Sequence, residues 1–277
     1  MPFLINRYFM KIVFTFLLIL SSFLNFAQIT ISSWNIKDMG KSKSDEVIGY
    51  MAETLRDFDV VAVQEVVAGP GGAQSVAQLT DELNRKGSKW DYAISNPTKS
   101  SPYSSERYAY LWKPSKVKVI GKPWLDQNFV DEIEREPYMM TISYQGKQLT
   151  LVNFHAVPST KQPEREIKYF KFLPNLYPDN QLVFMGDFNL PDHHTVFNPL
   201  KKKGYKHAFN GQKTSLRSKC NTKIKDDCLS KSYDHFFFSA SHVELLNCGV
   251  ISFYEDYANI KTAREVSDHI PIWVEVN

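Results

Sequence analysis

Short apolar runs of the length of a β-strand recur along the chain, separated by polar stretches. Several alternate apolar and polar residues or are rich in β-branched and aromatic side chains, which pack well on a pleated sheet. Gly146 stands between two of the runs and predicts a hairpin turn. We therefore expect strands at residues 29–36, 60–63, 108–112, 139–144, 149–154, 182–185, 236–238 and 270–276.

Three stretches between these runs carry apolar residues at helical spacing and predict helices. Ser44, Ser75 and Pro163 precede them, and these residue types favour helix starts. The apolar faces are formed by Val47, Ile48, Met51 and Leu55, by Val76, Leu79 and Leu83, and by Ile167, Phe170 and Leu173. Because strands outnumber helices and hairpins mix with helical crossovers, we predict an α/β (α+β) fold of packed mixed β-sheets flanked by helices.

The first 27 residues predict a signal peptide. Arg7 and Lys11 form a basic flank, residues 12–26 are apolar, and the small residue Ala27 precedes Gln28. The apolar stretch is short for a membrane span of ~20 residues, although an uncleaved anchor is the alternative. Cleavage would leave residues 28–277 as a single domain, secreted or periplasmic, with no stable membrane association.

Composition adds little to this picture, because 43% hydrophobic and 23% charged residues are typical of a globular protein. The net charge of +3 argues neither for nor against a polyanionic partner. The charge distribution is more informative, since residues 201–231 contain ten Lys or Arg against only Asp226 and Asp227. Such a run is either a solvated loop or a surface that faces phosphate groups.

The three cysteines do not suggest a structural zinc site, because no Cys-x-x-Cys or paired histidine spacing is present. Cys220 and Cys228 flank a short polar segment. In an oxidising compartment they would either be joined by a disulfide or remain free thiols. Cys248 lies among apolar residues, which predicts a buried free thiol.

Polar residues follow several of the expected strands at the point where each strand ends. Glu65 follows the run at 60–63, His155 follows 149–154, and Asp187 with Asn189 follows 182–185. Sites form where the ends of such strands converge. Carboxylates and an amide can hold Mg²⁺, and a histidine beside a carboxylate can act as acid or base. These are the parts that hydrolysis of a phosphodiester requires.

Eight short motifs, each weak alone, follow one another in a fixed order. They are Ser33-Trp34-Asn35-Ile36, Val63-Gln64-Glu65-Val66, Glu106-Arg107-Tyr108, Arg135-Glu136-Pro137, Asn153-Phe154-His155, Met185-Gly186-Asp187-Phe188-Asn189, Tyr233-Asp234 and Ser267-Asp268-His269-Ile270-Pro271. In this order they resemble the endonuclease/exonuclease/phosphatase superfamily and, within it, the deoxyribonuclease I-like branch. The resemblance implies a four-layer sandwich, two packed mixed β-sheets flanked by helices.

The resemblance also implies a hydrolase acting on phosphodiester bonds and a role for each motif. His155 would be paired with Glu106 and His269 with Asp234, and their carboxylates would stabilise the protonated imidazoles. Asp187 and Asn189 would position the water and the phosphate. Arg135 and Lys37 would contact the phosphate. Asn35 and Glu65 would bind the metal, with Asp268 near it. The implied cofactor is Mg²⁺, with Mn²⁺ or Ca²⁺ as alternatives.

Two positions depart from the branch that the chain resembles. Val67 replaces an arginine that enters the DNA minor groove, and Ser104 replaces a tyrosine that packs against the DNA sugar. The leading hypothesis is a secreted endonuclease that hydrolyses DNA with low sequence specificity, with nucleic acid as partner and no protein partner inferred. The rivals are the same chemistry on RNA, a phosphoinositide or sphingomyelin, and an inactive binding module, which is disfavoured because no expected catalytic position is substituted.

Overall fold

The computed structural model describes residues 28–101, 104–221, 224 and 228–277. The expected signal peptide, residues 1–27, lies outside the described residues. Among the helices in the described ranges, none combines the length and the apolar character needed to cross a membrane.

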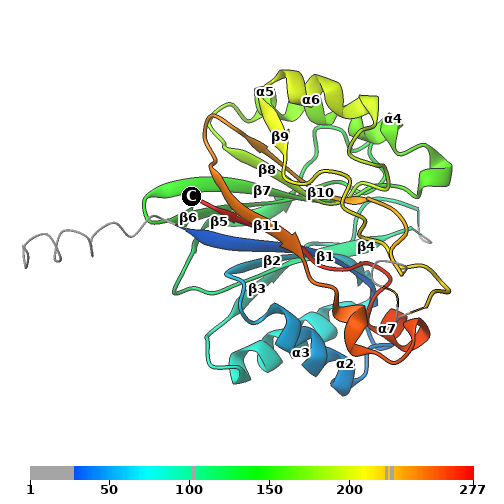
Figure 1. Ribbon diagram of the computed structural model, residues 1–277. Coiled ribbons are helices and arrows are strands. Elements are labelled where there is room, and N and C mark those ends of the chain that lie inside the picture. The colour runs from blue at the N-terminus through cyan, green and yellow to red at the C-terminus, as the bar shows by residue number, and fades with distance from the viewer. Residues whose placement is uncertain (1–27, 102–103, 222–223, 225–227) are drawn as a thin grey trace, which may run out of the picture.

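Two sheets of six strands pack face to face, and helices cover both outer faces (Figure 1). This arrangement confirms the expected four-layer fold. The first sheet and the helices beside it are β1 (Ile29–Met39), α2 (Asp45–Leu55), β2 (Val60–Val67), α3 (Pro70–Arg85), β3 (Asp91–Ile94), β4 (Glu106–Trp112), β11 (Leu245–Val250), η4 (Phe253–Asp256), α7 (Ile260–Val266) and β12 (Ile272–Val276).

The second sheet is formed by the middle of the chain. Its strands and helices are β5 (Lys118–Leu125), β6 (Tyr138–Tyr144), β7 (Lys147–His155), η1 (Ser159–Lys161), α4 (Glu164–Ile167), η2 (Phe170–Phe172), α5 (Leu173–Leu176), β8 (Leu182–Asp187), η3 (Thr195–Phe197), α6 (Asn198–Lys202), β9 (Tyr205–His207) and β10 (Asp234–Ser239). The strand orders are β11-β12-β1-β2-β4-β3 and β5-β6-β7-β8-β10-β9, so each sheet mixes parallel and antiparallel pairs.

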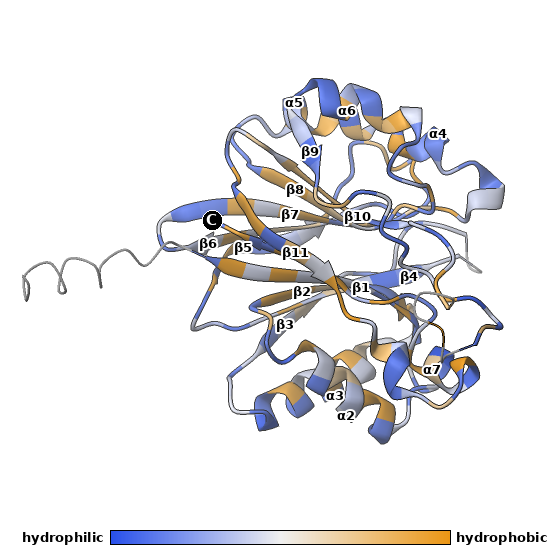
Figure 2. Ribbon diagram, viewed as in Figure 1, coloured by the Kyte–Doolittle hydropathy of each residue, from blue (hydrophilic) through white to orange (hydrophobic). Residues whose placement is uncertain are grey.

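Alternate residues of the central strands face the two sides of their sheet. In β2, Val60 and Ala62 pack in the layer between the sheets, whereas Val61 and Val63 pack against the helices. Both faces are therefore buried, which explains why these strands are continuously apolar in the sequence. Figure 2 shows the same arrangement, with apolar residues concentrated in the strands and on the inner sides of the helices.

The three predicted helices agree with the structure to different degrees. The first begins after Ser44, whose side chain accepts a hydrogen bond from the backbone N–H of Val47. The second begins at Pro70 and not after Ser75, because Pro70 suits a first helical turn. The third, after Pro163, is divided into α4, η2 and α5.

The hairpin at Gly146 is present, with Tyr144 paired with Lys147 across a two-residue turn. Gln145 and Gly146 both have positive φ, 43° and 84°, as a type I′ turn requires. The register of β6 and β7 is thereby fixed, which places His155 at the far end of β7.

Gly186 should be required for stability. Its φ is 129°, and a Cβ at this position would overlap the carbonyl oxygen of Phe154 on the neighbouring strand β7. We expect Gly186→Ala to lower the free energy of unfolding by more than about 3 kcal/mol, because backbone strain and overpacking combine. The matched control is Gly211→Ala, where φ is 65° but no atom lies within 4 Å. This variant should lose only about 1–2 kcal/mol. Equal losses for the two variants in urea denaturation would contradict the clash.

Candidate active site

The polar residues that follow the strands meet at one edge of the sandwich, around a pocket of about 550 Å³. The first sheet contributes Asn35, Glu65, Glu106, Asp268 and His269, from β1, β2, β4 and the segment before β12. The second sheet contributes His155, Asp187, Asn189 and Asp234, from β7, β8, the residues after β8, and β10. The site is thus built where two sheets face each other.

Backbone irregularities aim Glu65 into the pocket. The pairing of β2 with β4 shifts register between Val63 and Val66, which is the mark of a β-bulge. Glu65 lies within this shift and has a φ of 60°. A non-glycine residue in this conformation is strained, and such strain concentrates at functional sites.

His155 is held by Glu106. Its Nδ1 lies 3.0 and 2.9 Å from the two carboxylate oxygens of Glu106. The Tyr108 hydroxyl accepts a hydrogen bond from the His155 backbone N–H, which fixes the residue further. Burial favours neutral imidazole, but the Glu106 carboxylate outweighs it and raises the pKa of His155. Nε2 is left facing the pocket, 3.7 Å from Asp187 Oδ2.

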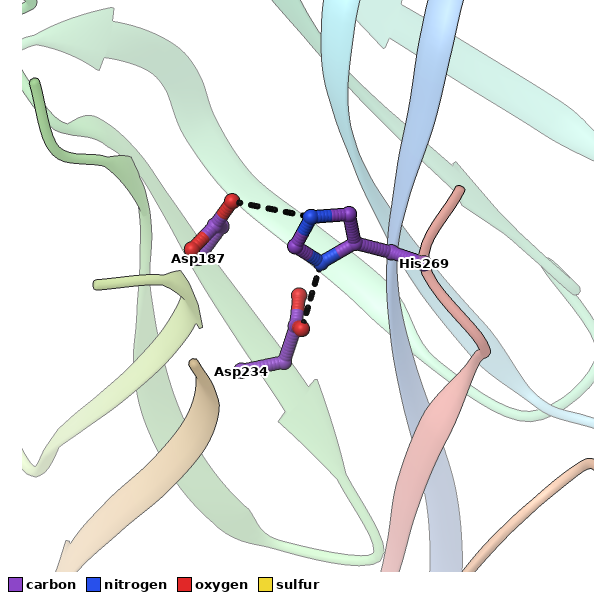
Figure 3. A group of neighbouring side chains, drawn as sticks. All are labelled: Asp187, Asp234 and His269. Carbon is purple, nitrogen blue, oxygen red and sulfur yellow. Dashed lines mark hydrogen bonds and ion pairs between the residues drawn. The ribbon is translucent and has the colours of Figure 1, made fainter. Parts of the chain in front are cut away.

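His269 has the same arrangement with Asp234, as Figure 3 shows. Nδ1 lies 2.7 Å from Asp234 Oδ2, and Nε2 lies 3.6 Å from Asp187 Oδ2. Burial opposes protonation here too, but Asp234 and then Asp187 raise the pKa of His269 to about 10. Burial also raises the pKa of Asp187. The Asp187 Oδ2 atom therefore lies between two imidazoles that carry protons readily.

Several contacts within the site join one sheet to the other, among them the side-chain pairs His155 with Glu106, His269 with Asp234, and Asn35 with Asp187. Just beneath them, the Gln64 side chain of β2 donates to Asn153 Oδ1 of β7 over 2.6 Å. The geometry of the site consequently depends on the separation of the two sheets.

The residues around Asn35 fit a divalent cation. Asn35 Nδ2 lies 2.9 Å from Glu65 Oε1 and 3.1 Å from Asp187 Oδ2, whereas Asn35 Oδ1 is buried with no partner among the described residues. Turning the amide by half a rotation would place three oxygens together, the ligand type that Mg²⁺ and Ca²⁺ prefer. Ligand atoms of Asp187, Asp234 and His269 also lie within 4.8 Å of one another. In that group, however, the imidazole already uses Nδ1 on Asp234.

A model of the Endonuclease/Exonuclease/phosphatase family matches residues 32–269. The chain belongs to this family. A Thioalkalivibrio deoxyribonuclease is 24% identical over 270 residues, which covers 90% of this chain and 71% of that enzyme. Bovine deoxyribonuclease-1 is 29% identical over 171 residues, covering 57% of this chain and 60% of that enzyme. Horse deoxyribonuclease-1 is 26% identical and covers 88% of this chain and 90% of that enzyme.

Solved structures of the family share the fold. The catalytic domain of human Nocturnin has a TM-score of 0.65 and 15% identity, covering 91% of this chain and 94% of that one. A mannosyl-6-phosphatase of Bacteroides thetaiotaomicron has a TM-score of 0.65 and 17% identity, covering 90% and 99%. The family and the deoxyribonuclease relatives support a hydrolase acting on phosphodiester bonds.

The two residues expected to contact phosphate, Lys37 and Arg135, differ in their exposure and in their hydrogen-bond partners. Lys37 is partly exposed, with its amine 3.9 Å from Asp268 Oδ2. Arg135 is buried: its Nε donates to the Ser104 carbonyl oxygen and its Nη1 to that of Ala156, over 3.1 and 3.0 Å. Nε and Nη1 of Arg135 thus hold backbone carbonyl groups, while the side chain still lines the pocket.

The described residues of the basic run 201–231 are distributed over more than one part of the fold. Lys201 and Lys202 belong to α6, in the outer layer over the second sheet (Figure 1). Lys219 and Lys231 are exposed on two arms, residues 214–221 and 228–231, of which the first pairs with the segment carrying His269. No residue of the run lines the pocket in the described part of the chain, and residues 223 and 225 lie outside the described residues.

Cys220 and Cys228 form a disulfide between these arms, which decides between the two alternatives left open by the sequence. Cys248 is free, as expected, but only half-buried on the edge strand β11, with Sγ 3.2 Å from the carbonyl oxygen of Ala208. Its burial was overestimated because a sheet edge is covered on fewer sides than a central strand.

Two charged residues that support the site were not identified from the sequence pattern. Lys43 donates from its amine to the carbonyl oxygens of Glu265 and Val266, over 2.9 and 2.7 Å, directly before the segment that carries Asp268. Burial lowers the pKa of Lys43 to about 8. Glu166 accepts the backbone N–H of Val157, two residues after His155. Neither residue lies in a motif, so no local pattern identifies it.

The raised pKa of His269 should make the free energy of unfolding depend on pH. A histidine whose pKa rises on folding stabilises the folded state fully below its unfolded pKa of 6.5, and this contribution is lost as the pH rises toward about 10. In EDTA, the difference in unfolding free energy between wild type and His269→Asn should therefore shrink as the pH rises through this window. A difference that stays constant would show that the buried imidazole is not protonated.

Proposed function

We propose that this protein is a secreted endonuclease that hydrolyses DNA with low sequence specificity and depends on a divalent cation, Mg²⁺ or alternatively Mn²⁺ or Ca²⁺. One observation carries the proposal. Two histidine–carboxylate pairs face the same Asp187 oxygen, beside the Asn35–Glu65 contact. This arrangement offers a proton donor, a proton acceptor and a cation site around one point, as phosphodiester hydrolysis requires.

The two imidazoles would move protons in opposite directions. His269, with a pKa of about 10, would give a proton to the leaving oxygen, and His155 would accept one from the attacking water. Glu106 and Asp234 would keep each ring in the tautomer that presents Nε2 to the pocket. Asp187 and Asn189 would orient the water and the scissile phosphate, since Asp187 Oδ1 already accepts the backbone N–H of Asn189.

Asn35 and Glu65 would hold the cation, with Asp268 near it. When bound, a divalent cation stabilises negative charge that develops on the phosphate. Lys37 would add a positive charge at the rim of the pocket. Arg135 would act mainly by holding the backbone of Ser104 and Ala156 around His155, and would contact phosphate only with its remaining donors.

Three observations support DNA and export. The relatives with the longest alignments are named deoxyribonucleases. Exposed Lys219 and Lys231 lie on the two arms, of which the first pairs with the segment that carries Asp268 and His269, and there they would meet a phosphate backbone. The sequence pattern of residues 1–27 supports a signal peptide, and the disulfide suits an oxidising compartment.

Supercoiled plasmid is the direct test. Purified protein should convert it to nicked circles and then to fragments in Mg²⁺ or Mn²⁺, and EDTA should abolish the conversion. Nicking at many positions would support low sequence specificity. Failure of folded, metal-supplied protein to cleave plasmid would overturn the proposal.

A second candidate is the same chemistry on another phosphoester, such as RNA, a phosphoinositide or sphingomyelin. It is favoured by the wall of the pocket, where Val67, Ala68, Gly69, Ser104 and Ser105 are small and uncharged. Such small, uncharged side chains offer few contacts to a DNA groove. Rates on plasmid, RNA and lipid phosphoesters at equal enzyme concentration would distinguish the candidates, because the true substrate class should be favoured by orders of magnitude in kcat/KM.

A further inference from the structure

Thr214 is fully buried behind Asp234, outside the lining of the pocket and outside every motif. Its Oγ1 accepts hydrogen bonds from the backbone N–H groups of Tyr233 and Asp234, over 3.2 and 3.1 Å. These bonds occupy the lone pairs of the hydroxyl, so its single proton is left to donate. The nearest acceptor is Asp234 Oδ2 at 2.6 Å, much closer than the Lys231 carbonyl oxygen at 3.4 Å.

Asp234 Oδ2 consequently accepts two hydrogen bonds, from Thr214 Oγ1 and from His269 Nδ1. The other oxygen, Oδ1, is buried and has no partner among the described residues. Because both bonds converge on one oxygen, Thr214 fixes the rotation of the carboxylate about its Cβ–Cγ bond. Among the described residues, the Thr214 hydroxyl is the one group besides His269 that hydrogen-bonds the Asp234 carboxylate, so without it the choice of the oxygen that faces His269 would not be fixed.

The backbone around Thr214 is paired with the segment that carries His269. The carbonyl oxygen of Thr214 accepts the backbone N–H of Ile270 over 2.8 Å, and the N–H of Leu216 donates to the carbonyl oxygen of Asp268 over 2.7 Å. The two segments therefore form a short ladder. This ladder sets the distance between the Thr214 hydroxyl and the His269 ring.

The second arm holds the first in place. The backbone N–H of Thr214 donates to Lys231, and that of Arg217 donates to Cys228, over 2.7 and 2.8 Å. The disulfide between Cys220 and Cys228 closes the two arms over a sequence separation of eight residues. A covalent link thus restrains the arm whose hydroxyl reaches Asp234.

We propose that Thr214 is a positioning residue for the reaction, which fixes the Asp234 carboxylate and through it the His269 imidazole, and that the disulfide-closed arms hold Thr214 in place. The kinetic part of this inference rests on the proposed function. The structural part, the orientation of the His269–Asp234 hydrogen bond, does not.

The kinetic test compares Thr214→Val, which keeps the shape and removes the hydroxyl, with Thr214→Ser, which keeps the hydroxyl. We expect Thr214→Val to lower kcat for DNA cleavage by about 10–100-fold, the usual effect of removing a residue that orients a functional group. KM should not change, because Thr214 does not line the pocket. Thr214→Ser should restore most of kcat.

The matched control is Thr80→Val. Thr80 is also buried, but its hydroxyl donates to the carbonyl oxygen of Val76 within α3, remote from the site. This variant should keep the wild-type kcat. Equal losses in Thr80→Val and Thr214→Val, or no rescue by Thr214→Ser, would assign the effect to stability and overturn the positioning role.

A measurement without substrate separates this inference from the proposed function. The His269 Nδ1 proton, shared with Asp234, should give a low-field proton NMR signal that is absent from His269→Asn. The signal should be lost or shifted in Thr214→Val and in Cys220→Ser/Cys228→Ser, and kept in Thr214→Ser. An unchanged signal in folded Thr214→Val overturns the inference even if DNA is cleaved. If Thr214→Val does not fold, Thr214→Ala provides the same comparison.

Discussion

Replacing Glu65 with glutamine should lower the rate of DNA cleavage by about 10³-fold, equivalent to about 4 kcal/mol of transition-state stabilisation. Glutamine has the same shape as glutamate but lacks the negative charge that attracts a cation. Glu65 lines the pocket and its Oε1 lies 2.9 Å from Asn35 Nδ2, so the substitution removes a carboxylate directly at the proposed cation site. Initial rates of plasmid nicking at saturating Mg²⁺ measure the loss.

Glu53→Gln is a suitable control, because Glu53 is an exposed residue of α2 and should tolerate the same loss of charge. Binding of Mn²⁺, followed by electron paramagnetic resonance, should weaken in Glu65→Gln and not in the control. A folded Glu65→Gln protein with near-normal turnover and unchanged Mn²⁺ binding would remove Glu65 from the cation site.

The two histidines should each be needed, and they should act as a unit. His155→Ala and His269→Ala should each lower the rate by about 10²–10⁴-fold, the usual contribution of a positioned proton transfer. Because both rings face Asp187 Oδ2, at 3.7 and 3.6 Å, we expect them to serve the same phosphate. The double variant should therefore lose much less than the product of the two single losses.

The competing account is that hydroxide generated at the cation carries the chemistry alone. His193→Ala serves as the control, since the side chain of His193 is 82% exposed and lies outside the pocket. If His155→Ala and His269→Ala cleave plasmid at nearly the rate of His193→Ala, proton transfer by the imidazoles is not part of the reaction.

The sequence predicted central strands well and edge strands poorly, for a physical reason. β1, β2, β7 and β8 are buried on both faces, so their apolar runs are continuous. The four strands that the pattern did not predict, β3, β5, β9 and β11, are the outermost strands of their sheets. Edge strands are half-exposed and carry polar residues, glycine or proline, which removes the periodic signal.

The same contrast holds for the site. Residues within a motif, such as Glu65 or His269, could be located because short local sequences carry their chemistry. Thr214 could not, because its partner Asp234 lies 20 residues away in the sequence. Glu166 could not, because it accepts the backbone N–H groups of Val157 and Glu134, which lie 9 and 32 residues away. Without the fold, nothing marks such a hydroxyl or carboxylate as different from one on the surface. Gly72 is similar: a Cβ at this position would overlap the Val67 carbonyl oxygen, so the glycine allows α3 to approach β2.

The order in which the strands are synthesised has a consequence for when the site can form. Asp268 and His269 directly precede β12, the strand that inserts between β11 and β1. Asn35, Glu65 and His155 are therefore synthesised before the second imidazole, His269. The pairing of His269 with Asp234 then also requires both sheets to close, because the two residues belong to different sheets. Under the proposed function, a partly folded chain would lack one of the two proton-transferring pairs, and nuclease activity would arise only with the complete fold.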